Sequence, residues 1–372
     1  MKKILCIVGT RPEAIKMAPV INLLKSDKSI QVRVLATAQH RQMLDQVLNI
    51  FNIEPDLDLD VMRPNQDLTT LTARLLNGLN DVLIVEKPDI VLAQGDTTTV
   101  FTAALASFYH KIPFGHIEAG LRTWDINNPF PEEMNRVLVS KITNWHFAPT
   151  ERSKLNLLAE GVQEDRIFVT GNTVIDALFS VIKKSAEISS GIDPIKRLIL
   201  VTVHRRENFG KPFEDICAAL ITLLENNSDI QVLFPVHPNP NIQEYANKIF
   251  GGHPRIVMCK PLDYLPFINA MQRAFLILSD SGGVQEEAPA LGKPVLVLRE
   301  ATERPEAVET GAVKLIGVKY EVIVSEVQKL LDDNNMYESM LKGGSPYGDG
   351  RAASRIIDVL HKYFDKQKIV EG

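Results

Sequence analysis

Cysteine is scarce in this chain of 372 residues, which contains only Cys6, Cys217 and Cys259. The three lie far apart, and none belongs to a CxxC pair or to a His/Cys cluster with the spacing of a zinc site. This pattern argues against a disulfide scaffold and predicts reduced thiols, as is usual in cytoplasmic proteins. We therefore expect no metal centre and a cytoplasmic location.

Long apolar runs and an excess of positive charge are also missing. No run approaches the ~20 apolar residues of a membrane span. Lys and Arg number 41 against 46 Asp and Glu, a net charge of −5, and nucleic-acid binding usually leaves a basic footprint. The start, Met1-Lys2-Lys3, is followed by a short apolar run at 4–8 without a small-residue cleavage site, which favours a strand over a signal peptide. We expect neither a membrane nor a nucleic-acid partner.

The chain is rich instead in short apolar runs that alternate with amphipathic stretches, and its length favours two domains at ~150 residues each. The pattern predicts strands at 3–8, 31–37, 90–93, 114–117, 198–203, 231–235, 256–258, 275–278 and 295–298. It predicts helices at 12–24, 41–51, 68–85, 99–109, 213–225, 264–270, 284–291 and 352–364. Such alternation implies parallel sheets with right-handed crossovers. The expected fold is α/β, with two Rossmann-like, doubly wound domains.

Residues 183–196 interrupt this pattern with serines, a glycine and a proline and therefore mark the boundary. We expect an N-terminal domain at 1–182, a C-terminal domain at 183–351, and a last segment, 352–372, whose helix packs back on the first domain. Ligands of open α/β sheets bind beyond the carboxyl ends of the strands. Polar clusters follow the predicted strands at 9–11, 94–96, 116–118, 204–206, 237–238 and 279–283. Two such edges facing each other would form a polar cleft.

The segment Gly9-Thr10-Arg11-Pro12-Glu13 joins a predicted strand to a helix. Free N–H groups at a helix start favour an anion, and Arg11 and Lys16 add positive charge. An ordinary strand–helix turn with a solvated arginine explains the motif equally well.

The segment 279–287 indicates a nucleotide site more strongly. Gly282 and Gly283 let the backbone approach a ligand where the following helix begins. Glu287 lies about one turn into that helix, where a carboxylate can bind the vicinal hydroxyls of a ribose or simply cap the helix.

Acidic residues follow strands or lie in Pro-rich loops of the first half, at Asp96, Glu118, Glu132 and Glu133. Carboxylates that converge on one cleft would suit general acid–base work at carbon. For Asp96, capping of the next helix is the competing interpretation. In the second half, His204-Arg205-Arg206 at a strand end is typical of a group that neutralises a leaving phosphate.

Taken together, these motifs closely resemble those of the non-hydrolysing UDP-N-acetylglucosamine 2-epimerases, over nearly the whole chain. The segments that carry the resemblance in the first half are GTRPEAIKMAP from 9, AQHR from 38, GDTTT from 95, HIEAGLRT from 116 and PEE from 131. Those of the second half are GNT from 171, HRREN from 204, 279–289, GKPV from 292 and TERPE from 302.

The resemblance implies two facing domains of glycosyltransferase-B type and a homodimer. It implies interconversion of UDP-GlcNAc and UDP-ManNAc without NAD or metal, so no cofactor is expected. UDP is eliminated to leave 2-acetamidoglucal and is then added back with the opposite configuration at C2. The product would supply ManNAc-type sugars for cell-surface polysaccharides.

The resemblance also assigns residues to this chemistry. Four are catalytic candidates: Asp96, Glu118, Glu132 and His204, the last assisting at the phosphate. Seven match positions that hold UDP: Arg11, Lys16, Ser281, Gly282, Gly283, Glu287 and Arg304.

A second, activating UDP-GlcNAc site is common in bacterial members of the family. Residues that match it are Gln39, His40, Gln42, Arg205 and His237. Two departures weaken this match, because Asn65 stands near a position that is usually Arg, and Trp124 stands where a Gly usually follows Thr123.

Three other functions share parts of this pattern. A glycosyltransferase has the same architecture, but the acidic clusters of the first half favour the epimerase. A hydrolysing epimerase would release free ManNAc, and such enzymes often carry a fused kinase domain for which this chain has no room. A sugar-nucleotide sensor without catalytic activity is the remaining alternative.

Overall fold

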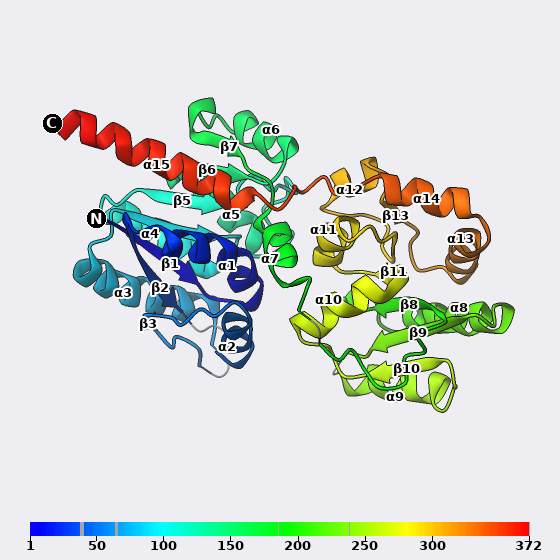
Figure 1. Ribbon diagram of the computed structural model, residues 1–372. Helices are drawn as coiled ribbons and strands as arrows, with labels where there is room; N and C mark the ends of the chain where they lie inside the picture. The colour runs from blue at the N-terminus through cyan, green and yellow to red at the C-terminus, as the bar shows by residue number, and fades with distance from the viewer. Residues whose placement is uncertain (38–40, 64–65, 185, 238, 372) are drawn as a thin grey trace. The chain divides into compact units, whose positions relative to one another are not determined.

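The computed structural model describes residues 1–37, 41–63, 66–184, 186–237 and 239–371 (Figure 1). The chain forms two compact units. Unit 1 comprises Met1–Ser180 together with Tyr347–Gly372, and unit 2 comprises Val181–Pro346. The chain therefore leaves unit 1, builds all of unit 2, and then returns to complete unit 1.

Unit 1 is a parallel sheet covered by helices. Four of its strands lie close to predicted ones, whereas those at Leu57–Asp58, Trp145–Ala148 and Ile167–Val169 were not predicted. The strands are β1 (Lys2–Val8), β2 (Ile30–Ala36), β3 (Leu57–Asp58), β4 (Ile90–Gln94), β5 (Phe114–Ile117), β6 (Trp145–Ala148) and β7 (Ile167–Val169). The helices are α1 (Arg11–Ser26), α2 (Arg41–Ile50), α3 (Leu68–Glu86), α4 (Thr98–Tyr109), α5 (Glu132–Ile142), α6 (Glu151–Ala159), the 3₁₀ turn η1 (Glu164–Arg166), α7 (Thr173–Val181) and α15 (Ala352–Glu371).

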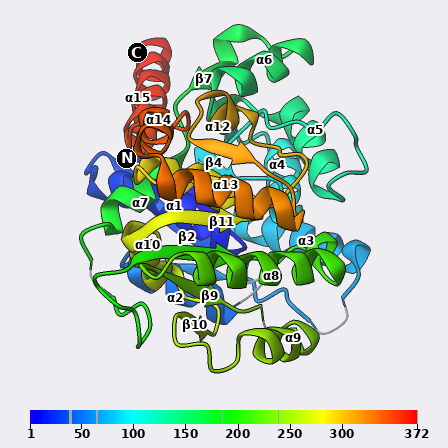
Figure 2. The same cartoon turned by 90° about the vertical axis from the view of Figure 1, so that its right-hand side faces the viewer.

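Unit 2 repeats the alternation. Its strands are β8 (Arg197–Thr202), β9 (Ile230–Pro235), β10 (Ile256–Cys259), β11 (Ala274–Ser279), β12 (Val295–Val297) and β13 (Val313–Leu315). Its helices are the 3₁₀ turn η2 (Arg206–Asn208), α8 (Lys211–Asn226), α9 (Pro240–Phe250), α10 (Tyr264–Arg273), α11 (Gly282–Ala290), α12 (Pro305–Glu309), α13 (Tyr320–Asp332) and α14 (Asn334–Lys342). Helices α8 and α13 lie side by side on one face of the sheet (Figure 2).

Both sheets are parallel and doubly wound. The strand order is β3-β2-β1-β4-β5-β6-β7 in unit 1 and β10-β9-β8-β11-β12-β13 in unit 2. The order reverses between β1 and β4 in the first sheet and between β8 and β11 in the second. Loops diverge at such a switch point, and the crevice between them is where ligands of doubly wound sheets bind. The polar clusters after β1, β4, β8 and β11 lie at these two points.

The central strands are buried on both faces, which explains their continuous apolar sequences. In β1, residues from Ile4 to Val8 are inaccessible to solvent or nearly so. The cores formed against these strands come mainly from leucine, isoleucine and valine side chains of the covering helices. Such cores hold the strand ends, and hence the loops that follow them, in fixed positions.

The last helix belongs to unit 1. The carboxylate of Asp176 in α7 accepts hydrogen bonds from the backbone N–H groups of Ala352 and Ala353, at 3.1 and 2.9 Å. Helix α15 then packs along α1 and buries Ile356, Leu360 and other apolar side chains. In the part of the chain that the structure describes, no helix has the length and apolar character needed to cross a membrane.

One prediction about local structure is wrong. Glu132 and Glu133 were expected in a Pro-rich loop, but they form the first turn of α5. The prolines end at Pro131, which stands at the N-cap position just outside the helix. Proline has no N–H to donate, so it is tolerated at a helix start, where N–H groups have no partner within the helix.

Candidate active site

Glu118 is the centre of the polar cluster at the switch-point edge of unit 1. It follows β5, is buried, and adopts a positive φ of 65°. Such a conformation is uncommon for a residue other than glycine and is found most often at functional sites.

Among the described residues, the donors to the Glu118 carboxylate are nitrogen groups. The ammonium of Lys16 lies 2.7 Å from both carboxylate oxygens. Asn172 donates to Oε1 at 3.2 Å, and the amide of Gln94 donates to Oε2. These partners come from α1, β4 and the loop after β7, so the fold gathers them around one carboxylate from three places in the sequence.

Asp96 follows β4 and belongs to a second network. Its carboxylate pairs with Arg136 of α5 at 2.7 Å, and Asn135 donates to its backbone carbonyl at 2.8 Å. Arg136 also contacts Glu133, 2.8 Å away, and the charges of both carboxylates help to raise its pKa even though burial opposes this. The interpretation of Asp96 as a helix cap is wrong, because the N-cap of α4 is Thr97.

The same network holds the turn in which the chain departs from the family pattern. Glu133 accepts hydrogen bonds from the backbone N–H groups of Thr123 and Trp124, at 3.0 and 3.1 Å. Trp124 has a φ of 67°, a conformation that glycine adopts without strain. This is a physical reason for the Gly that usually follows the Thr. Here the turn forms with a tryptophan, whose side chain is exposed.

Side chains of the same segment bind the backbone N–H groups at the start of α1. Thr10 and Glu13 form a capping box, and the Glu13 carboxylate accepts from the N–H groups of Gly9 and Thr10 at 2.7 and 2.8 Å. Two N–H groups that the sequence suggested for an anion are therefore already occupied. Burial raises the pKa of Glu13 to about 7, against the hydrogen bonds from Thr97, Gly9 and Thr10.

In unit 2, the residues predicted to hold UDP gather where α11 begins. Gly282 and Gly283 lie close to the charged groups. A side chain at Gly282 would begin 3.8 Å from the Arg304 guanidinium, and one at Gly283 would begin 3.9 Å from both Glu287 and Ser281. Ser281 occupies the N-cap position without a capping bond from its side chain. This helix start combines a glycine pair, a guanidinium and a carboxylate, as a site for a nucleotide diphosphate requires.

Two acidic residues of α11 hold this arrangement in place. Glu286 is buried and pairs with the guanidinium of Arg304. Tyr264 of α10 donates its hydroxyl proton to Glu287 at 3.2 Å. Glu287 is therefore oriented by a neighbouring helix as well as by its own.

His204 and Asp280 face each other across the second switch point. Nδ1 of His204, after β8, lies 2.6 Å from the carboxylate of Asp280, after β11. Arg205 also contacts Asp280, through its backbone N–H at 2.9 Å and through its guanidinium to the Asp280 carbonyl at 3.1 Å. The sequence motif pointed to His204 but not to its partner.

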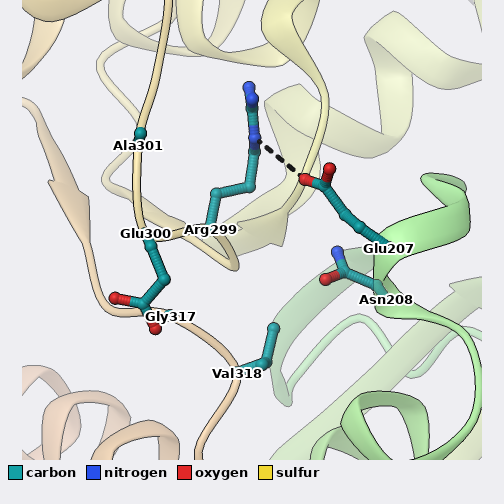
Figure 3. A pocket seen from close by; sticks show the side chains of 7 residues that line it. All are labelled: Glu207, Asn208, Arg299, Glu300, Ala301, Gly317 and Val318. Atoms are coloured by element: carbon teal, nitrogen blue, oxygen red, sulfur yellow. Dashed lines mark ion pairs between the residues drawn. The ribbon is translucent and has the colours of Figure 1, made fainter.

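A cavity of about 360 Å³ lies at the same edge of unit 2 (Figure 3). Arg299 lies along it, 3.4 Å from Glu207 and 2.9 Å from Glu303. Burial alone would raise the pKa of Glu303, but hydrogen bonds and charge from Arg299 outweigh it and lower that pKa to about 2. The described lining residues are Glu207, Asn208, Arg299, Glu300, Ala301, Gly317 and Val318. None of these seven was predicted to act in catalysis or to hold UDP.

The structure therefore brings some predicted residues together and leaves others apart. Lys16 contacts Glu118, and Gly282 and Gly283 lie beside Arg304 and Glu287. Arg11 is the half-buried first residue of α1, and Glu132 precedes Glu133 of the Asp96 network. Of the residues matched to a second sugar-nucleotide site, His237 follows β9, and its ring lies 5.7 Å from that of Phe209. Gln39, His40 and Asn65 lie outside the described residues, as does the side chain of Gln42.

The sequence did not identify the residues that hydrogen-bond or pair with the predicted site residues. These are Gln94, Asn172, Arg136, Asp280 and Glu286. Asn172 stood in a quoted motif, and Asp280 and Glu286 stood in another, but no spacing indicated their contacts. Among the described residues, no cluster of three or more His, Cys, Asp or Glu is placed to hold a metal.

Comparison with known proteins assigns the chain to a family. Residues 22–361 match the family model described as UDP-N-acetylglucosamine 2-epimerase. A curated relative of that name from Yersinia pestis is 53% identical over 371 residues, covering 97% of this chain and 99% of the relative.

Two solved structures cover almost the whole chain. A putative UDP-N-acetylglucosamine 2-epimerase from Listeria monocytogenes is 47% identical with a TM-score of 0.92, covering 98% of each chain. The Neisseria meningitidis enzyme bound to UDP-GlcNAc is 47% identical with a TM-score of 0.88, covering 97% of this chain and 100% of that one. They confirm the predicted fold of two Rossmann-like domains of glycosyltransferase-B type. Identity at this level over nearly the full length shows that the chain belongs to the UDP-N-acetylglucosamine 2-epimerase family of isomerases.

Proposed function

We propose that the enzyme interconverts UDP-GlcNAc and UDP-ManNAc without hydrolysis, by eliminating UDP and adding it back. The observation that carries the proposal is the buried Glu118 carboxylate, which follows β5 and is held by three nitrogen donors beside the switch point of unit 1. A fixed carboxylate at this place suits removal of a proton from carbon. The solved Neisseria meningitidis relative, which binds UDP-GlcNAc, supports the substrate.

The proposed reaction has two balanced halves. In the first, the C1–O bond breaks, UDP leaves with the electron pair, a carboxylate takes the C2 proton, and a C1–C2 double bond forms. In the second, a proton reaches C2 from the opposite face and the UDP oxygen attacks C1. Because C2–H is not next to a carbonyl, oxocarbenium character at C1 is needed to acidify it. Asp96, Glu118 and Glu132 are the proposed acid–base groups.

Unit 2 is proposed to hold the departing UDP. The start of α11 with Ser281, Gly282 and Gly283 would bind the diphosphate with Arg304, and Glu287 would bind the ribose hydroxyls. His204 would stabilise the negative charge that develops as the C1–O bond breaks. Arg11 and Lys16 of unit 1 are proposed to contribute further positive charge.

Turnover in D₂O tests this mechanism. Because the C2 proton is exchanged with solvent, the product should carry deuterium at C2, which NMR detects directly. The oxygen that bridges the sugar and the phosphate should also exchange with non-bridging positions, since UDP is briefly free of the sugar. His204→Ala should slow both processes, because neither occurs until the C1–O bond breaks.

The same incubation, with UDP-GlcNAc alone, separates the alternatives. A hydrolysing enzyme would give UDP and free ManNAc, and a glycosyltransferase without acceptor would leave C2 fully protonated. An active epimerase that leaves C2 fully protonated would overturn the proposed mechanism.

The nucleotide pocket gives a separate prediction. Glu287→Ala should weaken UDP binding by about 1–3 kcal/mol, as expected when charge-assisted hydrogen bonds to ribose hydroxyls are lost. Isothermal titration calorimetry measures the affinity. Tyr264→Phe is the matched control, because it removes the 3.2 Å hydrogen bond to Glu287 and keeps the carboxylate. Unchanged UDP affinity with a lower melting temperature would make Glu287 a helix cap only.

We also propose that a second UDP-GlcNAc acts as an activator, near Gln39, His40, Gln42, Arg205 and His237. The position of Arg205 supports this, because it lies between Asp280 and Glu303 and so links such a site to His204. A sigmoidal dependence of rate on UDP-GlcNAc that Arg205→Ala abolishes would support it.

A homodimer, a cytoplasmic location and a supply of ManNAc for cell-surface polysaccharides complete the proposal. Exposed apolar side chains on neighbouring helices of unit 1 support a dimer, because monomers rarely expose such patches. They are Ile84 and Val85 of α3, Phe108 and Tyr109 of α4, and Leu138 of α5. Sedimentation analysis at several concentrations measures the assembly state.

A further inference from the structure

Asp280 is a carboxylate without any exposure to solvent. It accepts from the backbone N–H of His204 at 3.0 Å, from the backbone N–H of Arg205 at 2.9 Å, and from the side-chain amide of Asn208 at 2.9 Å. Its fourth partner is Nδ1 of His204, 2.6 Å from Oδ1. An ionised carboxylate offers about four acceptor positions, so all those of Asp280 are occupied.

The contact determines which nitrogen of His204 carries a proton. A carboxylate can only accept, so the hydrogen between the two groups belongs to Nδ1 of the imidazole. Nε2 lies at the other end of the ring, and the side chain as a whole is 49% exposed. One edge of the ring is thus fixed in the protein, while the rest of the side chain reaches solvent.

The surroundings of Asp280 keep it ionised. Burial raises its pKa, but the hydrogen bond and charge of His204 and the donors Arg205 and Asn208 outweigh burial and hold that pKa below its ordinary value. Arg299 of the neighbouring loop adds positive charge on another side.

We propose that Asp280 is the positioning residue for His204, which it holds as an Nδ1–H tautomer so that Nε2 faces the departing diphosphate. The inference rests on the proposed function of His204 at the phosphate. When Nε2 is protonated, its N–H donates to a phosphate oxygen while Asp280 balances the charge of the ring. No bond to Asp280 forms or breaks during the reaction.

Histidine NMR of the full-length protein tests the geometry directly. The chain has eight histidines, so His204→Ala identifies the signals of His204 by their loss. In the wild type at high pH, the ¹⁵N shifts should show Nδ1 protonated and Nε2 unprotonated. The Nε2–H tautomer in the wild type would overturn the proposal, whatever any variant does.

Kinetics test the consequence. Asp280→Asn removes the negative charge that balances a ring protonated at both nitrogens, so kcat should fall about tenfold or more while KM changes less. The double variant with His204→Ala should be no slower than His204→Ala alone, because both changes remove the same function. Asn208→Ala is the matched control, since it removes a donor from the same carboxylate without touching the ring. It should retain the Nδ1–H tautomer of His204.

The outcomes separate this inference from the proposed function. If His204→Ala turns over normally, the proposed role of His204 is wrong. If His204→Ala is slow but Asp280→Asn keeps both turnover and tautomer, the positioning role is wrong. An additional loss in the double variant would show that Asp280 acts independently of His204, as part of the loop structure alone.

Discussion

Glu118→Gln should lower turnover by ~10² or more, the usual effect of losing a general acid–base group. Gln has one acceptor oxygen, and its amide nitrogen would face Lys16, Gln94 or Asn172, all of which donate. A free-energy cost of about 1–3 kcal/mol in stability should therefore accompany the loss of the base. Steady-state kinetics and thermal unfolding measure the two effects separately.

Asp96→Asn and Glu132→Gln should show a comparable loss of turnover with the fold retained. Glu160→Gln is the control, because Glu160 is also paired with an arginine, Arg122, but it closes α6 and has no proposed part in the reaction. Near-normal turnover of all three site variants would contradict the assigned chemistry. A large loss of turnover in Glu160→Gln would show that removing any ion-paired carboxylate lowers activity, whether or not it takes part in the reaction.

Acid should destabilise unit 1 through two histidines in neighbouring strands. His116 of β5 and His146 of β6 are register partners, and each is 1% exposed. Burial lowers the pKa of His116 to about 4, against its hydrogen bond to the Gly95 carbonyl. Burial, with the charge of His116, lowers the pKa of His146 to about 3.

The sign follows from proton binding in the two states. Between pH 6.5 and 4 the unfolded chain binds these protons and the folded chain does not, so stability falls as the pH falls. From pH 7 to 5 each histidine should remove about 2 kcal/mol, so the pair should remove about 4 kcal/mol. Glu13 acts in the opposite direction, because its pKa of about 7 lets the folded state take up a proton first.

A comparison of variants separates these contributions. His146→Leu keeps a buried side chain and removes one titrating group, so its stability should fall by about 2 kcal/mol less than the wild type between pH 7 and 5. Urea unfolding at the two pH values gives the difference, and a replacement of the half-buried His110, such as His110→Leu, is the control. Equal pH dependence of wild type and His146→Leu would mean that His146 is not kept neutral by burial.

The sequence predicted the strands well where they are continuous apolar runs. The predicted 114–117 and the observed β5 coincide, and the predicted 3–8 differs from β1 by one residue. The short strands β3, β6, β7 and β13 were missed. Strands β3 and β7 have only two and three residues. Strand β6 begins with Trp145 and His146 and β13 has Lys314 at its centre, so neither of these two forms an apolar run. Their burial comes from position in the sheet, which residue pattern alone does not show.

The sequence identified the candidate reacting groups of the site but not the residues that contact them. Strand ends and motifs located Glu118 and His204, because topology alone brings such positions to one edge. The partners lie far away in the chain: Lys16 is 102 residues from Glu118, and Asp280 is 76 residues from the backbone of His204. A single sequence contains no local signal for such pairs.

The return of the chain to unit 1 has a consequence for the order of synthesis. When a ribosome has made the chain through Pro346, every residue of unit 2 exists, but unit 1 still lacks its final helix. Until α15 is made, the surface of α1 that it covers stays open, and Asp176 has no N–H groups of Ala352 and Ala353 to bind. Domains generally fold in the order in which they leave the ribosome. Here unit 1 is the first to begin and the last to be completed, so the nascent protein carries an unfinished apolar surface throughout the synthesis of unit 2.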